Sequence, residues 1–587
     1  TDSSITSSSA SWGLGTVDGV SGLTRQSGAT GAATLTASDT LTLNAPINFN
    51  NTATTLNLRA NTIAAASATV SNQALATVTL DRASVGPLTV GGTAGAIQQA
   101  SLARFNNVSQ IIVGDTSRAL EVVGNVSVAV GNRLTLQGQT VTGISGSNTL
   151  ATTAGSMKVE AATGGLALNA NVTAASTLIL TEGDGSGISG SGTLTANQMA
   201  LRTSGTADLD GSTHQVSTLA AQVGSLSLRN GRALTVDTVD SLQGVVATDT
   251  VDVRTSGASS DITLNQAVSA GNSSQAEVGA LLASSRHFIN NAGSTGVQSS
   301  NGAWRVYSTT PTSDTRGGLV ADFKQYNATT ASTVLGTGDG MLYSVAPTLT
   351  AGLTGSTSKT YDATTTASLV AGNFSLSGAI DGDTVDLDLA GMGATYDTKN
   401  VGTGKTVTAT GLALDAASNG ATTVYGYQLA STSANGAIGS ITRRSIAVGD
   451  LSASNKVYDG NTTASLGLGN AILGSDVVTL SGSGQFDTKH VGTGKAVTVT
   501  GLGLAGGDAG NYELAATSGT LSAVSGSGVT VGDSGTATLT LSGTLSDINA
   551  FIAAASVKFQ TARDNTSSVV LTVSINDNGN TGGSAQS

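Results

Sequence analysis

The sequence predicts an all-β protein: a parallel β-helix (solenoid) shaft followed by tandem β-sandwich (Ig-like) repeats. Three observations support this fold class. Between residues 31 and 289, short runs such as "TLTLNA" and "SLSLRN" alternate aliphatic and polar residues, which is strand periodicity. Aromatic residues gather after residue 302. A Lys-x-Tyr-Asp phrase then occurs twice, beginning at Lys359 and Lys456. Because a copied phrase is typical of a tandem module, the second half of the chain is expected to contain repeated domains.

The composition indicates a folded chain of several modules with few large core side chains. Its 587 residues are too many for one compact core. Glycine is frequent, with 77 residues, while only 3% of residues are aromatic. The 39% of hydrophobic residues and a mean hydropathy of +0.12 argue against general disorder.

Charge and cysteine content exclude several classes of function. The formal net charge is −12, and only 11% of residues are charged, so no face is expected to carry the dense basic patch that nucleic acid requires. Cysteine is absent, which excludes disulfides, thiolate nucleophiles and thiolate metal sites. We therefore expect no nucleic-acid partner.

Residues 1–30 are predicted to be an N-terminal lead-in. They begin "TDSSITSSSASWGLG", without the basic and apolar regions of a signal peptide, and no run of 18 apolar residues occurs in the chain. We expect a mature chain or a fragment of a longer protein.

Residues 31–301 are predicted to form the β-helix shaft. Leu41 and Leu43 precede Leu56 and Leu58 by 15 residues, and Leu166 precedes Leu178 by 12. Such spacing favours coils of roughly 20 residues with stacked inward aliphatics over a row of sandwiches. A narrow solenoid interior also explains why aromatic residues are scarce there.

Residues 302–345 are predicted to be an aromatic cap of the shaft. This segment contains Trp304, Tyr307, Phe323 and Tyr326. The end of a solenoid exposes open strand edges and apolar core, which must be covered to prevent end-to-end aggregation.

Three phrases of this segment carry a family resemblance. "WRVYSTTP", "GGLVADFKQYN" and "GTGDGMLYS" together resemble the end of the shaft in filamentous-haemagglutinin-like bacterial adhesins of the two-partner secretion type, in which surface-protein repeats often follow. The N-terminal secretion domain of that family is not visible, and no proline follows an asparagine as in its Asn-Pro motifs. The resemblance implies an extracellular location at the bacterial cell surface.

Two repeats are predicted after the cap: a first repeat at residues 346–442 and a second repeat at 443–526. "YDTKNVGTGKTVTATGLAL" from Tyr396 matches "FDTKHVGTGKAVTVTGLGL" from Phe486. Both repeats resemble the Tyr-Asp-Gly (YDG/MBG-type) repeat near the C-termini of haemagglutinin-type adhesins, a β-sandwich module. We expect Tyr361 and Tyr458 to occupy equivalent, largely buried positions.

Residues 527–587 resemble part of a cadherin-like β module. Ser546 is a candidate N-cap for a short helix whose residues Ile548, Phe551 and Ile552 face inward. The segment is too short for an independent sandwich. Either the chain continues, or a neighbour lends strands and the molecule forms a homo-oligomer or filament through this module.

The sequence predicts no enzyme and no catalytic, cofactor-binding or metal site residues. His214, His287 and His490 are far apart in sequence and are expected on the surface. No zinc spacing, GxSxG, Walker loop or dinucleotide fingerprint occurs. The two "GTGK" phrases at Gly402 and Gly492 lack the full phosphate-loop spacing and are predicted to be β-turns.

Clustered acidic residues are candidates for catalysis, because some β-helices cleave polysaccharides with clustered aspartates. In "DGDTVDLDL", from Asp381, only Asp383 has an obvious counterpart in the second repeat, Asp476, so a turn and a solvated strand face are expected. Glu182 and the "NDNGN" stretch at 576–580 make Ca²⁺ the one candidate ion, although neither has a regular calcium spacing.

These observations favour a segment of a secreted bacterial cell-surface adhesin that serves adhesion, aggregation or biofilm matrix contact. Its partner would be a glycan or protein ligand at a cell surface or in the matrix, of unknown identity. The alternative is a structural subunit of an extracellular filament or surface layer assembled by β-strand exchange. A glycan-cleaving β-helix enzyme is the third hypothesis.

Overall fold

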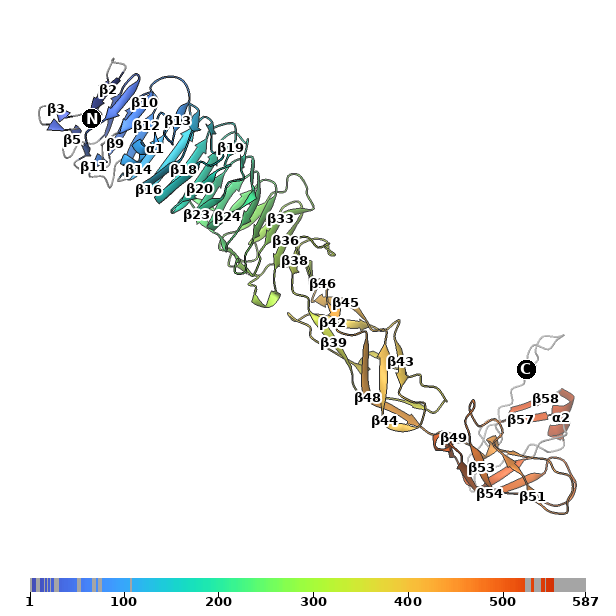
Figure 1. The fold of residues 1–587 in the computed structure, drawn as a ribbon. Helices are drawn as coiled ribbons and strands as arrows, with labels where there is room; N and C mark the ends of the chain where they lie inside the picture. Colours follow the sequence, from blue (N-terminus) through green and yellow to red (C-terminus); the bar gives the residue numbers. More distant parts are fainter. Residues whose placement is uncertain are drawn as a thin grey trace. The chain divides into compact units, whose positions relative to one another are not determined.

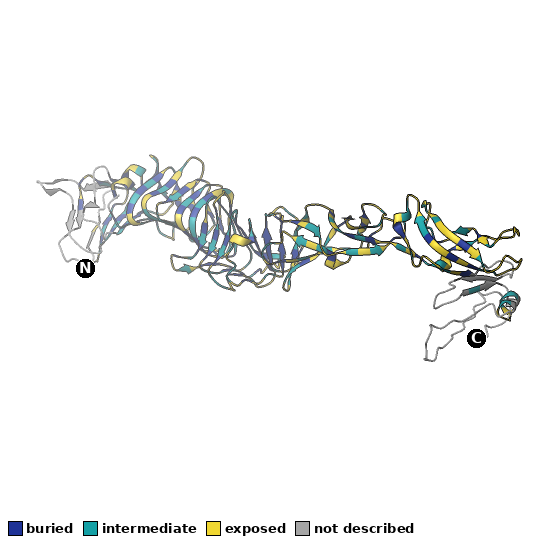
Figure 2. Cartoon of the chain, turned by 90° about the horizontal axis from the view of Figure 1, so that it is seen from below, coloured by how far each residue is buried: buried dark blue, intermediate teal, exposed yellow. Residues whose placement is uncertain are grey.

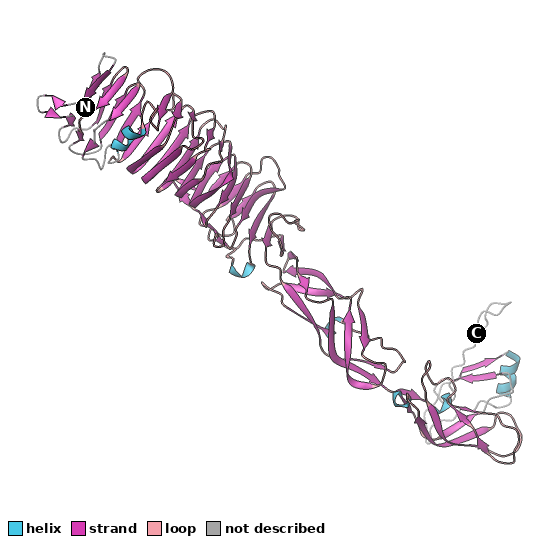
Figure 3. Cartoon of the chain, in the orientation of Figure 1, coloured by secondary structure: helices cyan, strands magenta, loops and turns pink. Residues whose placement is uncertain are grey.

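The computed structural model describes residues 31–49, 54–65, 77–105 and 108–522, together with short elements within residues 3–25, 70–71 and 529–553. Strands dominate these residues (Figure 3). Apart from 3-10 turns, the described helices are α1 (Gln99–Leu102) and α2 (Leu545–Ala553). The all-β class predicted from the sequence is confirmed.

The chain forms two compact units that do not follow a single cut in the sequence. Unit 1 comprises residues 1–352, 375–392 and 411–433. Unit 2 comprises residues 353–374, 393–410 and 434–587. The strands of the first repeat are therefore shared between the two units.

Parallel strand pairing builds most of unit 1 (Figure 1). In one series, Leu134 is in register with Met157, and Met157 with Leu178, 21 to 23 residues apart, and all three are fully buried. The aliphatic side chains thus stack in a ladder, while the residues between them face outward. The strands of this series are β6 (Gly31–Thr36), β9 (Thr54–Arg59), β12 (Thr77–Asp81), β14 (Gln110–Val113), β16 (Val126–Gly138), β18 (Thr149–Ala161), β21 (Thr177–Glu182), β23 (Leu194–Arg202), β24 (Thr206–Val223), β29 (Val245–Ala247), β32 (Val268–Ala270) and β35 (Val297–Ser299).

Two further parallel series line the same core. One series is β13 (Leu88–Val90), β15 (Leu120–Val122), β17 (Val141–Thr142), β19 (Leu166–Ala167), β22 (Ile188–Ser189), β24, β25 (Ser225–Asn230), β30 (Val251–Thr255), β33 (Val278–Ala283), β36 (Ala303–Ser308) and β38 (Gly340–Tyr343). The other links β16, β18, β20 (Asn171–Ala174), β23, β24, β26 (Leu234–Val236), β31 (Ile262–Leu264) and β34 (Phe288–Asn290). Smaller pairings use β1 (Ser3–Thr6), β2 (Ser11–Leu14), β3 (Thr16–Val17), β4 (Val20–Ser21), β5 (Leu23–Arg25), β7 (Thr40–Leu43), β8 (Ile47–Phe49), β10 (Thr62–Ala65), β11 (Val70–Ser71), β27 (Thr238–Val239) and β28 (Leu242–Gln243).

The register corrects the spacing argument made from the sequence. Leu41 pairs with Ile63, whereas Leu56 pairs with Val78, so the 15-residue spacing separates two strand series and not two successive coils. Coil length also varies. A 20-residue coil joins Met199 to Leu219 in register, but Val78 and its partner Ile111 are 33 residues apart. Helix α1 lies in that longer connection.

Large side chains fill the end of unit 1. All six residues of β36 are buried, whereas earlier strands alternate, and Trp304 continues the ladder beside Ala280. The sheet then continues in parallel through β38 and β37 (Phe323–Gln325) to β46 (Thr422–Tyr425). It ends with the antiparallel strands β45 (Ala413–Asn419) and β42 (Thr384–Asp388). The strand edge at the end of the parallel series is therefore covered by paired strands, as protection against edge-to-edge pairing requires.

Unit 2 contains two four-stranded sheets of mainly antiparallel strands around one apolar cluster that includes Tyr361, Val407, Ile441 and Val497. The first sheet is β40 (Thr357–Thr360), β48 (Ser433–Thr442), β44 (Gly402–Thr410) and β43 (Gly393–Tyr396). The second is β51 (Thr463–Ala464), β53 (Thr479–Phe486), β54 (Ala496–Ala505) and β56 (Gly519–Ser522). The other strands of unit 2 are β49 (Arg444–Ile446), β50 (Ser452–Ala453), β52 (Leu466–Gly467) and β55 (Tyr512–Leu514). The strands β39 (Thr348–Leu353), β41 (Phe374–Ser377) and β47 (Gln428–Leu429) form a separate sheet that lies mostly in unit 1.

Burial differs between the strands of the two units (Figure 2). Strands of unit 1 such as β16 bury many of their residues, whereas β53 in unit 2 has one buried residue among eight. The second repeat is therefore a thin layer with much exposed strand surface.

The last described elements are the hairpin of β57 (Val529–Gly532) and β58 (Thr540–Gly543), followed by α2. The helix was predicted, but it begins at Leu545, so Ser546 lies inside it and is not the N-cap. Ile552 is 51% exposed, so the prediction that it faces inward is wrong. Across the described chain, no helix has the length and apolarity to cross a membrane.

Candidate functional site: two lysine, tyrosine and aspartate joints

Asp383 lies at the centre of a buried polar cluster in unit 1, which we call the first joint. Its side chain has no exposed surface. One carboxylate oxygen accepts hydrogen bonds from Lys324 Nζ and from Asn419 Nδ2, the latter at 2.8 Å. The other accepts from the hydroxyls of Tyr326 at 2.6 Å and Tyr427 at 3.0 Å. The buried charge is thus fully paired, which is the condition for burying a carboxylate without a large penalty.

The two tyrosines of the first joint pack edge to face and act as donors. The ring centroids of Tyr326 and Tyr427 are 5.0 Å apart, with an interplanar angle of 68°. Burial and the neighbouring Asp383 carboxylate raise the pKa of Tyr427 to about 12, and burial together with the hydrogen bond to Asp383 raises the pKa of Tyr326 further. Both hydroxyls are therefore protonated at neutral pH.

The same arrangement recurs in unit 2 around Asp476, as the second joint. The Asp476 side chain is 1% exposed, and one oxygen accepts a hydrogen bond from Lys399 Nζ. The other oxygen accepts from the hydroxyls of Tyr361 at 2.6 Å and Tyr512 at 2.8 Å. The rings of Tyr361 and Tyr512 meet edge to face at 5.4 Å and 72°. The lysine, the aspartate and the two tyrosines of the first joint therefore recur in the second joint.

The charge state of the second joint follows from opposing effects. Burial alone would raise the pKa of Asp476, but the bonds from Lys399, Tyr361 and Tyr512 outweigh it and hold that pKa below the usual value. Burial and the bond to Asp476 raise the pKa of Tyr361 to about 12. At neutral pH the joint therefore contains one carboxylate, one ammonium group and two neutral phenols.

A backbone hydrogen bond to the second tyrosine is also repeated in the two joints. The Tyr427 hydroxyl accepts a hydrogen bond from the amide of Ile380 at 3.0 Å, and the Tyr512 hydroxyl accepts one from the amide of Leu473 at 2.9 Å. Ile380 precedes Asp383 by three residues, and Leu473 precedes Asp476 by three. Each repeat therefore presents the same aspartate and tyrosine face.

The donating groups come from different backbones in the two joints. Lys324 and Tyr326 are two residues apart along β37 and the loop after it. Tyr361 directly follows β40, and Lys399 lies 38 residues later in a loop between β43 and β44. The aspartate and tyrosine face therefore pairs with a lysine and a tyrosine regardless of the element that supplies them.

An additional ion pair distinguishes the first joint. Asp381 accepts hydrogen bonds from Arg316 and, at 2.7 Å, from Lys324. Asp381 has φ of +58°, and Gly474, at the equivalent position of the second repeat, has φ of +56°. A non-glycine residue is uncommon in this region, although aspartate tolerates it better than most. The ion pairs offset the conformational cost that glycine avoids.

The repeated Lys-x-Tyr-Asp phrase forms the turn that presents the tyrosine. Lys359 Nζ is 2.7 Å from Asp362 Oδ1 and donates to the carbonyl oxygen of Thr364 at 2.8 Å. In the second repeat, Lys456 is 2.8 Å from Asp459 and donates to the carbonyl oxygen of Asn461 at 3.0 Å. The lysine and the aspartate close the turn, and the tyrosine belongs to this turn in both repeats.

The GTGK phrases close the loops that carry Lys399 and Lys489. Lys405 pairs with Asp397 at 2.8 Å, and Lys495 pairs with Asp487. Gly404 has φ of +63° and Gly494 has φ of +64°. The first phrase begins strand β44, so the β-turn predicted at Gly402 is wrong, whereas the second phrase lies in the loop before β54.

Two sequence predictions at these positions are wrong. Asp383 was expected on a solvated strand face, but it is buried because four donors surround it. Tyr458 was expected to be buried like Tyr361, but it is 58% exposed, against 1% for Tyr361. Its turn is formed, yet among the residues that the structure describes no aspartate bonds to its hydroxyl.

Sequence reasoning also missed the lysines of the joints. The signal was present for one of them, because "DTK" occurs at the same place in both repeats and supplies Lys399 and Lys489. Nothing in the single phrase "DFKQYN" indicates that Lys324 would be buried.

The histidines provide no site. His214 was expected on the surface but is fully buried: its Nδ1 accepts from the amide of Leu194 at 3.0 Å, and its Nε2 lies 2.9 Å from the carbonyl oxygen of Leu209. Burial lowers the pKa of His214. His287 is half-buried and His490 is exposed. In the part of the chain that the structure describes, no three His, Asp or Glu side chains are grouped to hold a metal ion.

The two calcium candidates have different outcomes. Glu182 is buried and accepts hydrogen bonds from the amides of Asp184 and Gly187 at 2.7 and 3.1 Å and from the Thr203 hydroxyl. Its oxygens therefore hold a loop together, which leaves no reason to assign a calcium ion there. The stretch at 576–580 lies outside the described residues.

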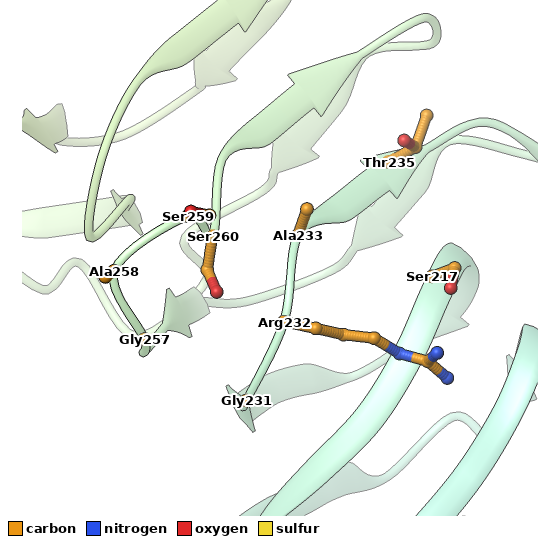
Figure 4. Close-up of a pocket in the computed structure, with 9 residues that line it drawn as sticks. All are labelled: Ser217, Gly231, Arg232, Ala233, Thr235, Gly257, Ala258, Ser259 and Ser260. Carbon is orange, nitrogen blue, oxygen red and sulfur yellow. The ribbon is translucent and has the colours of Figure 1, made fainter.

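A cavity of about 640 Å³ in unit 1 offers little chemistry (Figure 4). Its lining consists of Arg232 and small residues: Ser217, Gly231, Ala233, Thr235, Gly257, Ala258, Ser259 and Ser260. Arg232 donates to the carbonyl oxygens of Gln215 and, at 2.8 Å, of Ala196. The guanidinium thus ties neighbouring coils together.

The comparisons with known proteins agree with the repeats. No curated protein and no solved structure matches the chain. The family model described as the YDG domain matches residues 345–434 and residues 442–520. Each match contains one complete aspartate and tyrosine face, Asp383 with Tyr427 and Asp476 with Tyr512. The chain therefore contains YDG domain sequence in two tandem copies within residues 345–520.

Proposed function

We propose that this chain is a segment of a secreted bacterial cell-surface adhesin of the filamentous-haemagglutinin-like type. In this proposal the three parallel strand series form a β-helical shaft, and the two YDG copies are Ig-like sandwich repeats. Each coil of a parallel stack adds about 4.8 Å along its axis. The shaft would hold the rest of the chain at a distance from the cell surface, and the repeats would add to that distance.

The observation that carries the proposal is the repeated joint. A chain that only needed to link domains could use a flexible linker, whereas each joint here buries a carboxylate with a lysine and two tyrosines. Such a network costs desolvation energy and is strongly directional, so it fixes how one module follows another. Serial modules with fixed joints suit a protein that must hold a binding surface away from a cell.

The remaining elements of the proposal follow from the same reasoning. The chain is not an enzyme, has no cofactor and does not bind nucleic acid. Its ligand is a glycan or protein of a cell surface or biofilm matrix, and it acts outside the cell. The joints use their titratable groups in buried hydrogen bonds.

The test is display of the chain on a non-adherent bacterium. We expect the displayed chain to cause aggregation, biofilm growth or binding to an array of glycans and matrix proteins. An unrelated β-solenoid of matched length, displayed at equal density, is the control. Folded chain that gives none of these responses above the control would exclude the adhesive function. Ordered polymers of the purified chain in electron micrographs would favour the alternative, a structural subunit of an extracellular filament or surface layer.

A further inference from the structure

The free end of the second repeat carries the same groups that the first repeat uses to bind its neighbour. Tyr458 and Lys489 are the counterparts of Tyr361 and Lys399, which pair with Asp476. All nine tyrosines of the chain lie among the described residues, and Tyr458 is the one whose side chain is exposed. Lys489 is exposed as well.

The supporting framework of this end is already formed. The turn around Tyr458 is closed by the Lys456 and Asp459 pair, and the loop around Lys489 is closed by the Asp487 and Lys495 pair. Between the turn and the loop lies a cavity of about 370 Å³ lined by residues of both. The end is therefore prearranged, which lowers the ordering cost of binding.

The apolar rim of this end is also uncovered. Val401, beside Lys399, is partly buried, and its amide donates to Asn511 of the second repeat at 2.9 Å. Its counterpart Val491, beside Lys489, is 86% exposed. The second repeat thus exposes Lys489, Tyr458 and Val491. Their counterparts in the first repeat contact the second repeat.

We propose that the surface formed by Tyr458, Lys489 and Val491, here called the open end, binds the aspartate and tyrosine face of a further YDG-type repeat. The two such faces in this chain are occupied by the first and second joints. Residues 523–587 contain no tyrosine, so they cannot supply a third face of this kind. The partner is a YDG-type repeat whose face is unoccupied. This inference does not rest on the proposed adhesive function.

The absence of cysteine from the chain allows a specific cross-linking test. The probe is the full chain with Tyr361→Ala and Lys399→Ala, which remove the residues covering the face of Asp476 and Tyr512, and with Asn511→Cys. The donor is the full chain with Val491→Cys, placed to mimic the contact of Val401 with Asn511. A thiol cross-linker is added to the mixture, and the yield of the mixed dimer is measured.

We expect a mixed dimer whose yield falls at least tenfold when the donor also carries Tyr458→Ala and Lys489→Ala. A probe with the additional change Asp476→Ala should show the same loss. If the alanine probe fails to fold by circular dichroism, a probe with Lys399→Ala as the single change at the face uncovers part of Asp476 and replaces it, with the same controls. No mixed dimer with a folded probe, or a yield unaffected by the Tyr458 and Lys489 changes, would overturn the proposal. Self-association of the unmodified chain that Tyr458→Ala abolishes would also overturn it, because the partner would then be a second copy.

Discussion

The covered end of the first repeat and the open end of the second repeat are built alike but differ in burial. Both have the turn closed by lysine and aspartate, and both have the loop closed by the lysine of GTGK. Tyr361 at the covered end is 1% exposed, whereas Tyr458 at the open end is 58% exposed. The turn and the loop at the end of a repeat therefore form without a bound neighbour. Burial of the tyrosine, by contrast, requires one.

This difference separates two roles within one phrase. The lysine and the aspartate of Lys-x-Tyr-Asp bond within their own turn in both repeats. The tyrosine contributes to stability only where an aspartate and a second tyrosine meet it. Mutations at equivalent positions should therefore have unequal effects at the two ends.

The largest effect is expected for the buried carboxylates. Asp383→Ala leaves Lys324 buried without its closest partner, and breaking a buried pair typically costs about 3 to 5 kcal/mol. Asp386→Ala, an exposed position in the same stretch, should change the free energy of unfolding by less than about 0.5 kcal/mol. Amide hydrogen exchange in β42 and β45 measures both. Equal effects of the two changes would mean that the first joint does not stabilise its surroundings.

The tyrosines provide the direct comparison of the two ends. Tyr361→Ala removes a fully buried ring and should cost about 3 to 5 kcal/mol, as for other buried aromatic residues. Tyr458→Ala should cost less than about 0.5 kcal/mol, because the ring is exposed. The free energies are obtained from amide exchange in β44 and β54. A loss at Tyr458 as large as that at Tyr361 would contradict the assignment of an open end.

Acid should weaken the second joint but not the open end. The pKa of Asp476 is lowered in the folded state, so its stabilisation is present above its unfolded pKa of about 3.9 and is lost as pH falls through the folded value. Replacing Lys399 with Met removes one of the groups that lower this pKa, so the folded and unfolded pKa values move closer together and the stability lost on acidification should be smaller. Lys489→Met is the matched control and should leave the profile unchanged. Unfolding measured from pH 3 to pH 7 compares them, and identical profiles for the two variants would refute the role of Lys399.

The smallest effect is expected for Asp314, a half-buried carboxylate that accepts hydrogen bonds from the Ser308 hydroxyl and from the amide of Phe288. Burial raises its pKa to about 6. A raised folded pKa favours the protonated acid, so this contribution is complete below about pH 3.9 and is lost as pH rises to about 6. Asp314→Asn should therefore gain stability relative to the unmodified chain between these values, by less than about 3 kcal/mol. Thermal unfolding of both proteins at pH 4 and pH 7 gives the comparison, and a variant that is relatively less stable at pH 7 would contradict the sign.

The sequence predicted the joints only in part. The aligned repeats show that Asp383 corresponds to Asp476 and that Tyr427 corresponds to Tyr512. They also show a lysine at the equivalent positions 399 and 489. Lys324 and Tyr326 share the Lys-x-Tyr spacing of the copied phrases, but Lys359 and Lys456 bond within their own turns, so the spacing does not predict a lysine that bonds to the aspartate of a joint. Lys324 and Tyr326 enter the first joint because β37 pairs with β46 of the following segment, a contact between residues about 100 positions apart.

The sequence by itself determined the all-β class, the aliphatic alternation and the copied phrases, because strand periodicity and turn residues are local properties. Only the tertiary structure decided which copied residues are buried. Tyr361 and Tyr458 have the same local turn, and their exposure depends on whether an aspartate and tyrosine face lies opposite, which no local pattern encodes. It also decided that Asp383, in a stretch typical of a solvated strand, is the acceptor of a buried network, because the donors that pair with its charge come from distant strands.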